Sequence, residues 1–294
     1  MNVIKNPPVD ALRNAAKHTL YVEGSDPEAM DPTVLKALFN SAIQVKPLGP
    51  SHHVKSVANA LHRHHPDYYF LIDRDYHSDD EVESSWRRFP DPDQSNLIIW
   101  RKREIENHFT DPNYLRKSEY YQSKANEPEN TILKIANERL YLDAVNHVIA
   151  TIREQQKKNW IECFTNPDSF RSPDGALQRL TDAVNQSARL SQISDSVAPN
   201  HLKDRFNQTV ERFSGGCFPL QWNCGQWIDC LRGKPILSGI INTCFTVVDR
   251  HGMNLKGKEK INEVIKSLLR LPLNQQPNDF QQLHKLIMDR VNAP

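Results

Sequence analysis

The sequence lacks several familiar signatures, and each absence disfavours a class of protein. No apolar run approaches the roughly 20 residues that a helix needs to cross a bilayer. The first residues contain no apolar core of a secretory signal, so we expect a cytoplasmic protein without a membrane partner. No GxxxxGK[ST] segment occurs, and the chain itself should not hydrolyse ATP. GxSxG, HExxH and the kinase motifs are also missing, which disfavours serine hydrolases, zinc proteases and kinases.

Charge and cysteine content narrow the choice further. The net charge is only +1, so a nucleic-acid partner has to be met by a local basic patch rather than by a basic chain. The five cysteines form no CxxC pair and are predicted to be free, buried thiols. Four of them fall between Cys217 and Cys244, which leaves a structural zinc site as the weaker alternative.

Short apolar runs alternate with helical patterns in the first part of the chain. The predicted strands are residues 18–22, 43–45, 68–72 and 97–100, and the predicted helices are 30–40 and 54–61. Asp31 is the expected cap of the first helix, with Pro32 at its first position. The polar stretch 78–95 predicts an exposed loop with at most one short helix. This alternation predicts an α/β domain with a mainly parallel sheet, which we assign to residues 1–125.

The pattern becomes helical in the remainder of the chain. Apolar residues at helical spacing predict helices at 132–156, 177–190, 199–213, 234–245, 258–269 and 280–291. No internal repeat or low-complexity tract interrupts them. We therefore predict a mainly α-helical domain over residues 126–294.

Acidic residues follow the ends of two predicted strands. Glu23 stands in LYVEGSD, and Asp73 and Asp75 directly follow the apolar strand in YYFLIDRDY. Parallel sheets bind ligands at the carboxyl ends of their strands, and carboxylates that converge there repel one another unless a divalent cation lies between them. We therefore predict a Mg²⁺ site, with Mn²⁺ as an alternative, that neutralises a phosphodiester and supports the departing oxygen. Glu23 either binds the ion or acts as a general acid or base.

Simpler explanations exist for the same residues. Acidic residues at strand ends are ordinary turn formers, and Arg74 would then pair with one of them. Glu104 and Glu106 would form the negatively charged first turn of a helix. The dense histidines are expected to lie on a solvated helix face and to have no role: His52, His53, His62, His64 and His65. The cations predicted to contact phosphate are Arg101, Lys102 and Arg103, beside the acidic residues, and Lys234 in RGKPIL.

The order of EGSD, LIDRD and REIEN resembles the Toprim fold of topoisomerases, primases and overcoming-lysogenization-defect nucleases. LIIWRKREIENHF is similar to a narrower family, the Toprim-like nuclease subunit that is paired with an ATPase in PARIS-type phage-defence systems. The motif resemblance covers residues 18–110. It implies that Glu23 is the catalytic glutamate, that Asp73 and Asp75 bind metal, and that Glu104 or Glu106 completes a second metal position. Asp26 or Glu28 would assist, although Pro27 interrupts the acidic run.

The resemblance also implies a biological role. It predicts a metal-dependent endonuclease effector of an anti-phage defence system that cleaves RNA, specifically tRNA. An ABC-type ATPase sensor subunit would hold this toxin-like effector inactive, and the released chain would act as a homodimer. The alternative is a non-enzymatic module whose helical half docks a partner protein. A topoisomerase or primase fragment is disfavoured, because no nucleophilic-tyrosine domain or zinc ribbon is evident.

Overall fold

The computed structural model describes residues 18–91, 93–124, 127–159, 176–178, 181–182 and 194–293. The chain divides into two compact units, the first comprising Met1–Asn137 with Ile228–Pro294 and the second Glu138–Trp227. The first unit is therefore discontinuous in sequence. This division differs from the predicted boundary at residues 125 and 126, because the last helices of the chain belong with the sheet and not with the helices of the second unit.

A four-stranded parallel sheet forms the centre of the first unit. Its strands are β1 (Thr19–Glu23), β2 (Gln44–Gly49), β3 (Tyr68–Ile72) and β4 (Leu97–Ile99), in the order β2-β1-β3-β4. The pairs β1·β2, β1·β3 and β3·β4 are all parallel, which confirms the predicted α/β architecture. Leu20, Tyr69 and Phe70 are fully buried in the two central strands. Burial on both faces explains why these strands are continuously apolar rather than alternating.

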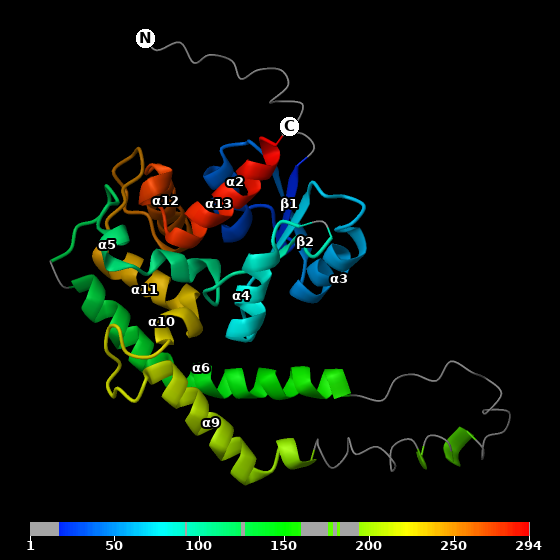
Figure 1. Ribbon diagram of the computed structural model, residues 1–294. Coiled ribbons are helices and arrows are strands. Elements are labelled where there is room, and N and C mark those ends of the chain that lie inside the picture. The colour runs from blue at the N-terminus through cyan, green and yellow to red at the C-terminus, as the bar shows by residue number, and fades with distance from the viewer. Residues whose placement is uncertain are drawn as a thin grey trace. The chain divides into compact units, whose positions relative to one another are not determined.

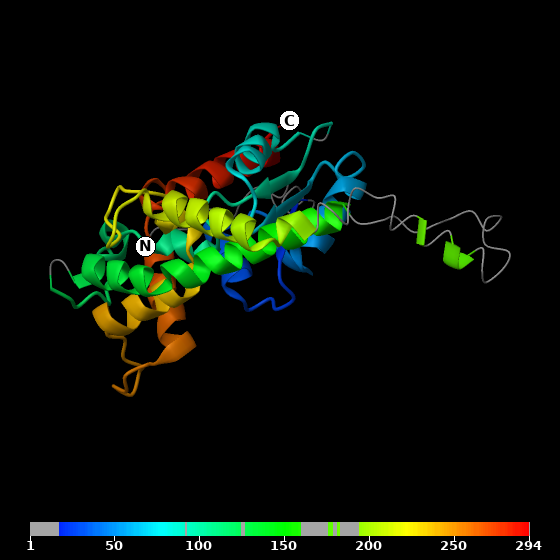
Figure 2. The same cartoon turned by 90° about the horizontal axis from the view of Figure 1, so that it is seen from below.

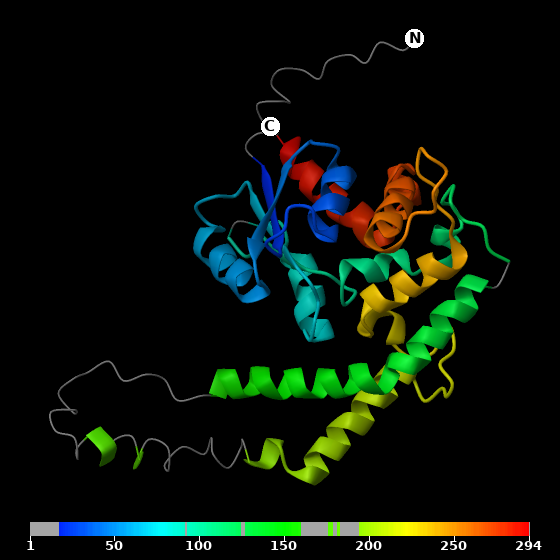
Figure 3. The ribbon, with the colours of Figure 1, turned by 180° about the vertical axis from the view of Figure 1, so that it is seen from behind.

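Helices cover both faces of this sheet. α2 (Met30–Phe39) connects β1 to β2, and α3 (Ser51–Leu61) connects β2 to β3. Figures 1 and 3 show α2 with α13 (Asn278–Val291) on one side of the strands and α3 on the other. The residue that caps α2 is Ala29, so Asp31 is the second residue of the helix and not its cap as predicted. Pro32 accordingly stands third rather than first.

The stretch predicted as an exposed loop with room for one short helix contains the ten-residue helix α4 (Asp79–Arg88). Its buried residues Val82, Ser85 and Trp86 lie at spacings of three and four, and they form one face against β4. A capping box joins Ser78 to Glu81 at its start. The many charged residues of this segment obscured a narrow apolar stripe that is sufficient for a helix.

The remaining elements of the first unit lie on either side of the second unit in sequence. Before it come the 3₁₀ helix η1 (Ile105–Phe109) and α5 (Pro112–Leu115). After it come α11 (Gly233–Cys244), α12 (Gly257–Leu269), the 3₁₀ helix η3 (Leu273–Gln275) and α13. The short helix α10 (Trp227–Cys230) lies at the boundary. α11 contacts η1, and both α12 and α13 contact α2, so the C-terminal helices complete the packing around the sheet.

The second unit is helical. It contains most of α6 (Glu127–Asn159) together with α9 (Pro199–Ser214), drawn in green and yellow-green in Figure 2. The rings of Tyr141 and Phe206 are 6.3 Å apart and those of His147 and Phe213 are 5.6 Å apart. The helix predicted at 177–190 falls largely outside the described residues. Within the described part of the chain, no helix is both long and apolar enough to cross a membrane.

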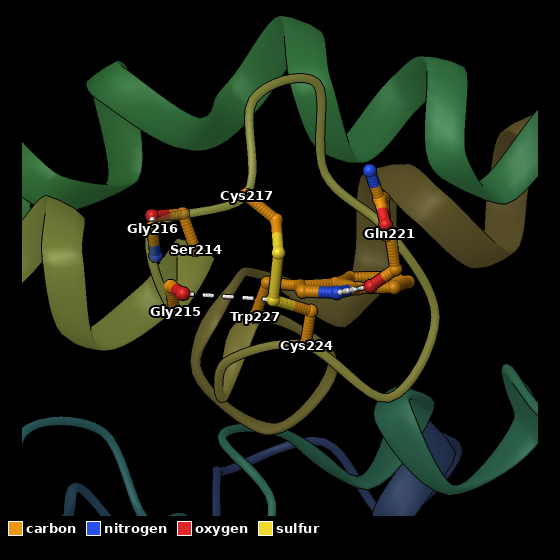
Figure 4. The surroundings of a disulfide bond; sticks show 7 residues. All are labelled: Ser214, Gly215, Gly216, Cys217, Gln221, Cys224 and Trp227. Atoms are coloured by element: carbon orange, nitrogen blue, oxygen red, sulfur yellow. Dashed lines mark hydrogen bonds between the residues drawn. A yellow bond between two sulfur atoms is a disulfide. The ribbon is translucent and has the colours of Figure 1, made fainter.

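Two of the cysteines in the second unit form a disulfide. Cys217 and Cys224 are bonded in the loop that follows α9, which corrects the prediction of free thiols throughout (Figure 4). The backbone of this loop packs tightly against the end of α9, since a Cβ added at Gly225 would lie 2.2 Å from the carbonyl oxygen of Phe213. Cys230 and Cys244 are free and buried, as predicted, and Cys163 lies outside the described residues.

Candidate active site

The ends of β1 and β3 bring Glu23 and Asp73 to the same edge of the sheet. Val22 pairs with Leu71 in parallel register, so Glu23, the last residue of β1, and Asp73, the first residue after β3, lie at the same edge of the sheet. Gly24 turns the chain away from β1 with a φ of +106°, a left-handed conformation that favours glycine. The acidic residues at these strand ends are therefore neighbours in space, as their positions in the sequence predicted.

Each of these two carboxylates has one oxygen that is buried without a hydrogen-bond partner. The two atoms are Glu23 Oε2 and Asp73 Oδ1. A buried carboxylate oxygen normally accepts a hydrogen bond, because the loss of its hydration is otherwise uncompensated. Two such oxygens at one sheet edge are the expected appearance of a cation site.

The pKa values of Glu23 and Asp73 are raised by burial and by neighbouring carboxylates. Desolvation, followed by the charges of Asp31, Glu23, Asp75 and Glu106, raises the pKa of Asp73 well above its ordinary value. Desolvation and then the charge of Asp75 raise the pKa of Glu23. A cation among these groups would reverse both effects, because it favours the charged form of each carboxylate. We call Glu23, Asp31, Asp73, Asp75 and Glu106 the acidic edge.

Asp31 and Glu106 join the acidic edge from elements outside the sheet. Desolvation and the charge of Glu106 raise the pKa of Asp31 to about 7, although Asp31 lies in the first turn of α2. Glu106 lies in the first turn of η1 and is only 5% exposed. Its pKa is raised, chiefly by desolvation, while Lys234 opposes the shift. Sequence reasoning had assigned Asp31 only to helix capping.

Asp75 is the exposed member of the acidic edge. Its φ of 44° is left-handed, a conformation that aspartate adopts more readily than most residues other than glycine. Its amide N–H donates to the carbonyl oxygen of Arg103 over 3.4 Å. This backbone turn brings Asp75 back toward the edge, so that it contributes to the pKa increase at both Glu23 and Asp73.

The contacts of the Arg74 guanidinium lie away from the acidic edge. The guanidinium donates to the carbonyl oxygen of Arg101 over 2.8 Å and forms an ion pair with Asp79. Arg74 is buried, with 8% exposure. The simpler explanation, in which Arg74 neutralises Asp73 or Asp75 as part of a turn, therefore receives no support from these contacts.

Glu104 holds the start of α11. Its Oε1 accepts from Arg232 Nε over 3.0 Å and its Oε2 accepts from the backbone N–H of Lys234 over 3.1 Å. Gly233 allows this close approach, because a Cβ at that position would lie 2.4 Å from Asn107 Oδ1. The geometry thus gives Glu104 a structural partner for each oxygen, whereas Glu106 belongs to the acidic edge.

Lys234 provides positive charge beside the acidic edge. It is the second residue of α11 and is exposed. Although desolvation acts to lower its pKa, the charges of Glu106, Glu104, Asp73 and Asp31 raise it. Lys234 is therefore a firmly protonated ammonium next to carboxylates, a suitable place for a phosphate oxygen.

The other predicted phosphate contacts are engaged with the protein. Arg101 forms ion pairs with Glu83 and Asp279 and lies 4.0 Å from the Trp86 ring centroid. Lys102 Nζ is 3.8 Å from Asp229 Oδ1. Arg103 is 4% exposed and donates to the carbonyl oxygen of Cys230 and the hydroxyl of Tyr76. These three cations therefore join the segment after β4 to α4, α10 and α13.

Asp26 and Glu28 lie in the turn between β1 and α2. Both are exposed, and Asp26 Oδ1 accepts from the backbone N–H of Glu28 over 2.9 Å. Neither is among the main causes of the pKa shifts of Glu23 and Asp73. Their recorded interaction is that of a local turn.

The residues present fit Mg²⁺ in the way that this ion usually binds. Among the described residues, no preformed group of three or more His, Cys, Asp or Glu side chains could by itself hold a metal. Mg²⁺ seldom needs one, since it commonly uses one or two carboxylates, several waters and the phosphate of its substrate. Glu23 and Asp73 would be those carboxylates, because their unpartnered oxygens are the free ligands at the edge.

Comparison with known proteins adds nothing to this geometry. No family model matches the chain, and neither a curated protein nor a solved structure is significantly similar to it.

Proposed function

We propose that this chain is a Mg²⁺-dependent nuclease that hydrolyses phosphodiester bonds. The observation that carries the proposal is the pair of buried, unpartnered oxygens on Glu23 and Asp73, within a group of carboxylates that raise one another's pKa. Proteins retain such unfavourable clusters where a ligand relieves them. A bound Mg²⁺ would supply charge neutralisation of the phosphate and an activated water.

The protein groups have distinct parts in this proposal. Glu23 and Asp73 bind the ion, and Asp75 adds negative charge from the exposed side of the edge. Lys234 binds a non-bridging oxygen of the substrate phosphate, which the carboxylates would otherwise repel. The charges of Glu106 and Asp31 favour the protonated form of Lys234, as its raised pKa reflects.

The resemblance described for residues 18–110 supports a narrower version of the proposal. It favours RNA, specifically tRNA, as the substrate, and an anti-phage effector that an ABC-type ATPase sensor holds inactive and that becomes a homodimer on release. The alternative is an interaction module without catalysis. One observation favours it, namely the exposed apolar residues on α6: Tyr141, Leu142, Val145 and Ile149.

Cleavage by the purified full chain distinguishes these functions. The chain is incubated with total tRNA or supercoiled plasmid, and Mg²⁺ or Mn²⁺ is varied against an EDTA control. We expect cleavage only with metal, and loss of at least about 100-fold in rate for Glu23→Gln and Asp73→Asn. Asp289→Asn, an exposed aspartate on α13, is the matched control and should cut normally. Normal cutting by both site variants would remove the acidic edge as the catalytic site, and absence of cutting by the parent would favour the interaction module.

A further inference from the structure

A second lysine lies beside the acidic edge, on the side opposite Lys234. Lys55, which is partly buried on α3, lowers the pKa values of Glu23 and Asp75 through its charge. Lys234 instead acts on Asp31 and Glu106. The two lysines belong to α3 and α11, and these helices lie on opposite sides of the strands in Figures 1 and 3.

A hydrogen-bonded chain holds Lys55. Its Nζ is 2.7 Å from Nε2 of His77, and Nδ1 of His77 is 3.2 Å from Oε2 of Glu81. An ammonium has only protons to donate, so Nε2 of His77 accepts and Nδ1 carries the proton that is donated to Glu81. Desolvation, followed by the charge of Lys55, lowers the pKa of His77, which agrees with a neutral ring. His77 is thus fixed in one tautomer from both sides.

The start of α4 fixes Glu81, the last residue of this hydrogen-bonded series. Glu81 is the third residue of α4, and its Oε2 also accepts from the backbone N–H of Ser78 over 3.1 Å. The Ser78 side chain accepts in return from the backbone N–H of Glu81 over 3.3 Å. The capping box therefore orients the Glu81 carboxylate toward His77, and helix formation places the imidazole that holds Lys55.

We propose that Lys55 is a second phosphate-binding residue of the site and that His77 is the residue that positions it. This inference rests on the proposed nuclease function. A nucleic-acid backbone carries a negative charge at every phosphate. The five carboxylates of the acidic edge repel each phosphate that a metal ion does not neutralise. Lys55 and Lys234 would contact phosphates on either side of the cleaved bond, so the strand crosses the sheet edge from α3 toward α11.

The rival explanation is that Lys55 only offsets the negative charge of Glu23 and Asp75. Binding measurements separate the two. Labelled single-stranded RNA is titrated with the full chain carrying Asp73→Asn, which prevents cleavage, with and without Lys55→Met. We expect Lys55→Met to weaken binding about tenfold and to reduce the slope of log affinity against log salt by about one, since one phosphate contact is lost. Lys55→Arg should bind within about threefold of the parent, and the matched control Lys46→Met, an exposed lysine on β2, should bind normally.

Kinetics with intact Asp73 give an independent readout. Lys55→Met should raise KM about tenfold and leave kcat within about threefold, because the contact lies away from the reacting bond. His77→Phe should raise KM in the same way, and His77→Gln should restore it, because its amide oxygen accepts from Lys55 as the imidazole does. Thermal unfolding and Mn²⁺ binding of each variant verify that the fold and the acidic edge are intact.

A failure of this inference can be distinguished from a failure of the proposed function. If the parent cuts and Lys55→Met has the parental KM, affinity and salt slope, this inference is wrong and the proposed function stands. If the parent neither binds nor cuts any nucleic acid, both are wrong.

Discussion

Arg232 donates from Nε to Oε1 of Glu104 over 3.0 Å, and this contact joins η1 to the start of α11. Glu104 is buried, whereas the side chain of Arg232 is 43% exposed. The carboxylate is therefore the partner whose loss of hydration has to be compensated. The contact keeps Lys234 beside the acidic edge, because the same carboxylate accepts the backbone N–H of Lys234.

We expect Glu104→Gln to destabilise the protein by about 1–3 kcal/mol, the usual cost of disrupting a buried charged hydrogen bond. Urea denaturation of the metal-free chain measures this free energy of unfolding. The control Glu263→Gln breaks an exposed ion pair with Lys266 on α12 and should cost less than about 0.5 kcal/mol. If Glu104→Gln is as stable as the parent and loses Mn²⁺ affinity, Glu104 is a metal ligand after all.

Asp73→Asn should stabilise the metal-free protein by about 0.5–2 kcal/mol, even though it abolishes cleavage. The substitution removes a charge that desolvation and four neighbouring carboxylates oppose. Thermal unfolding in EDTA is the measurement. With excess Mn²⁺ the order should reverse, because only the parent gains stability from the bound ion. An Asp73→Asn protein that melts below the parent in EDTA would mean that this carboxylate has stabilising partners.

The stability of the metal-free protein should fall as the pH rises from about 6.5 through about 7 and should level off by about pH 8, because Asp31 is then ionised in both the folded and the unfolded protein. The pKa of Asp31 is raised from 3.8 to about 7, so its contribution to stability is complete below its unfolded pKa and is lost as the pH rises through the folded value. The lowered pKa of His108 keeps that buried ring neutral throughout this window. We expect the melting temperature in EDTA to decrease by about 2 °C over this range.

Asp31→Asn tests the origin of this slope. The variant should melt at a more nearly constant temperature between about pH 6.5 and about 8, because the titrating carboxyl is gone. Addition of Mg²⁺ to the parent should also flatten the profile, since a bound cation stabilises the ionised carboxylates. An unchanged slope in Asp31→Asn would assign the effect to other groups.

The denatured, unreduced protein should show at most three reactive thiols among its five cysteines, because Cys217 and Cys224 are joined. Reduction before denaturation should bring the number to five. Closure of this short loop restricts the unfolded chain, so Cys217→Ser should lower the stability by about 2 kcal/mol. Five thiols in the unreduced protein, purified without exposure to reductant, would show that the bond does not form.

Strand positions could be predicted well because the sheet is buried on both faces. Residues 68–72 were predicted and observed as a strand, since an uninterrupted apolar run bounded by polar residues has few other interpretations. α4 could not be predicted with the same certainty, because most of its residues are charged and its helical face consists of Val82, Ser85 and Trp86. The discontinuous first unit was missed because periodicity shows where a helix lies but not what it packs against.

The acidic edge could be predicted in part. Glu23, Asp73 and Asp75 follow strands, and strand ends of a parallel sheet meet by geometry. Asp31 and Glu106 reach the edge through the packing of α2 and η1, which no spacing in the sequence specifies. Lys55 was missed for the same reason. The signal that could have led to it is the S-x-x-E capping box at Ser78, directly after His77.

The discontinuity of the first unit has a consequence for synthesis. A ribosome that has made Met1–Asn137 has produced all four strands and all five residues of the acidic edge. Lys234 and the helices that contact α2 are translated only after the whole of Glu138–Trp227. A nascent or truncated polypeptide therefore carries the carboxylates and Lys55 without Lys234, and on our proposal it lacks one of the two lysines that would hold the substrate phosphates.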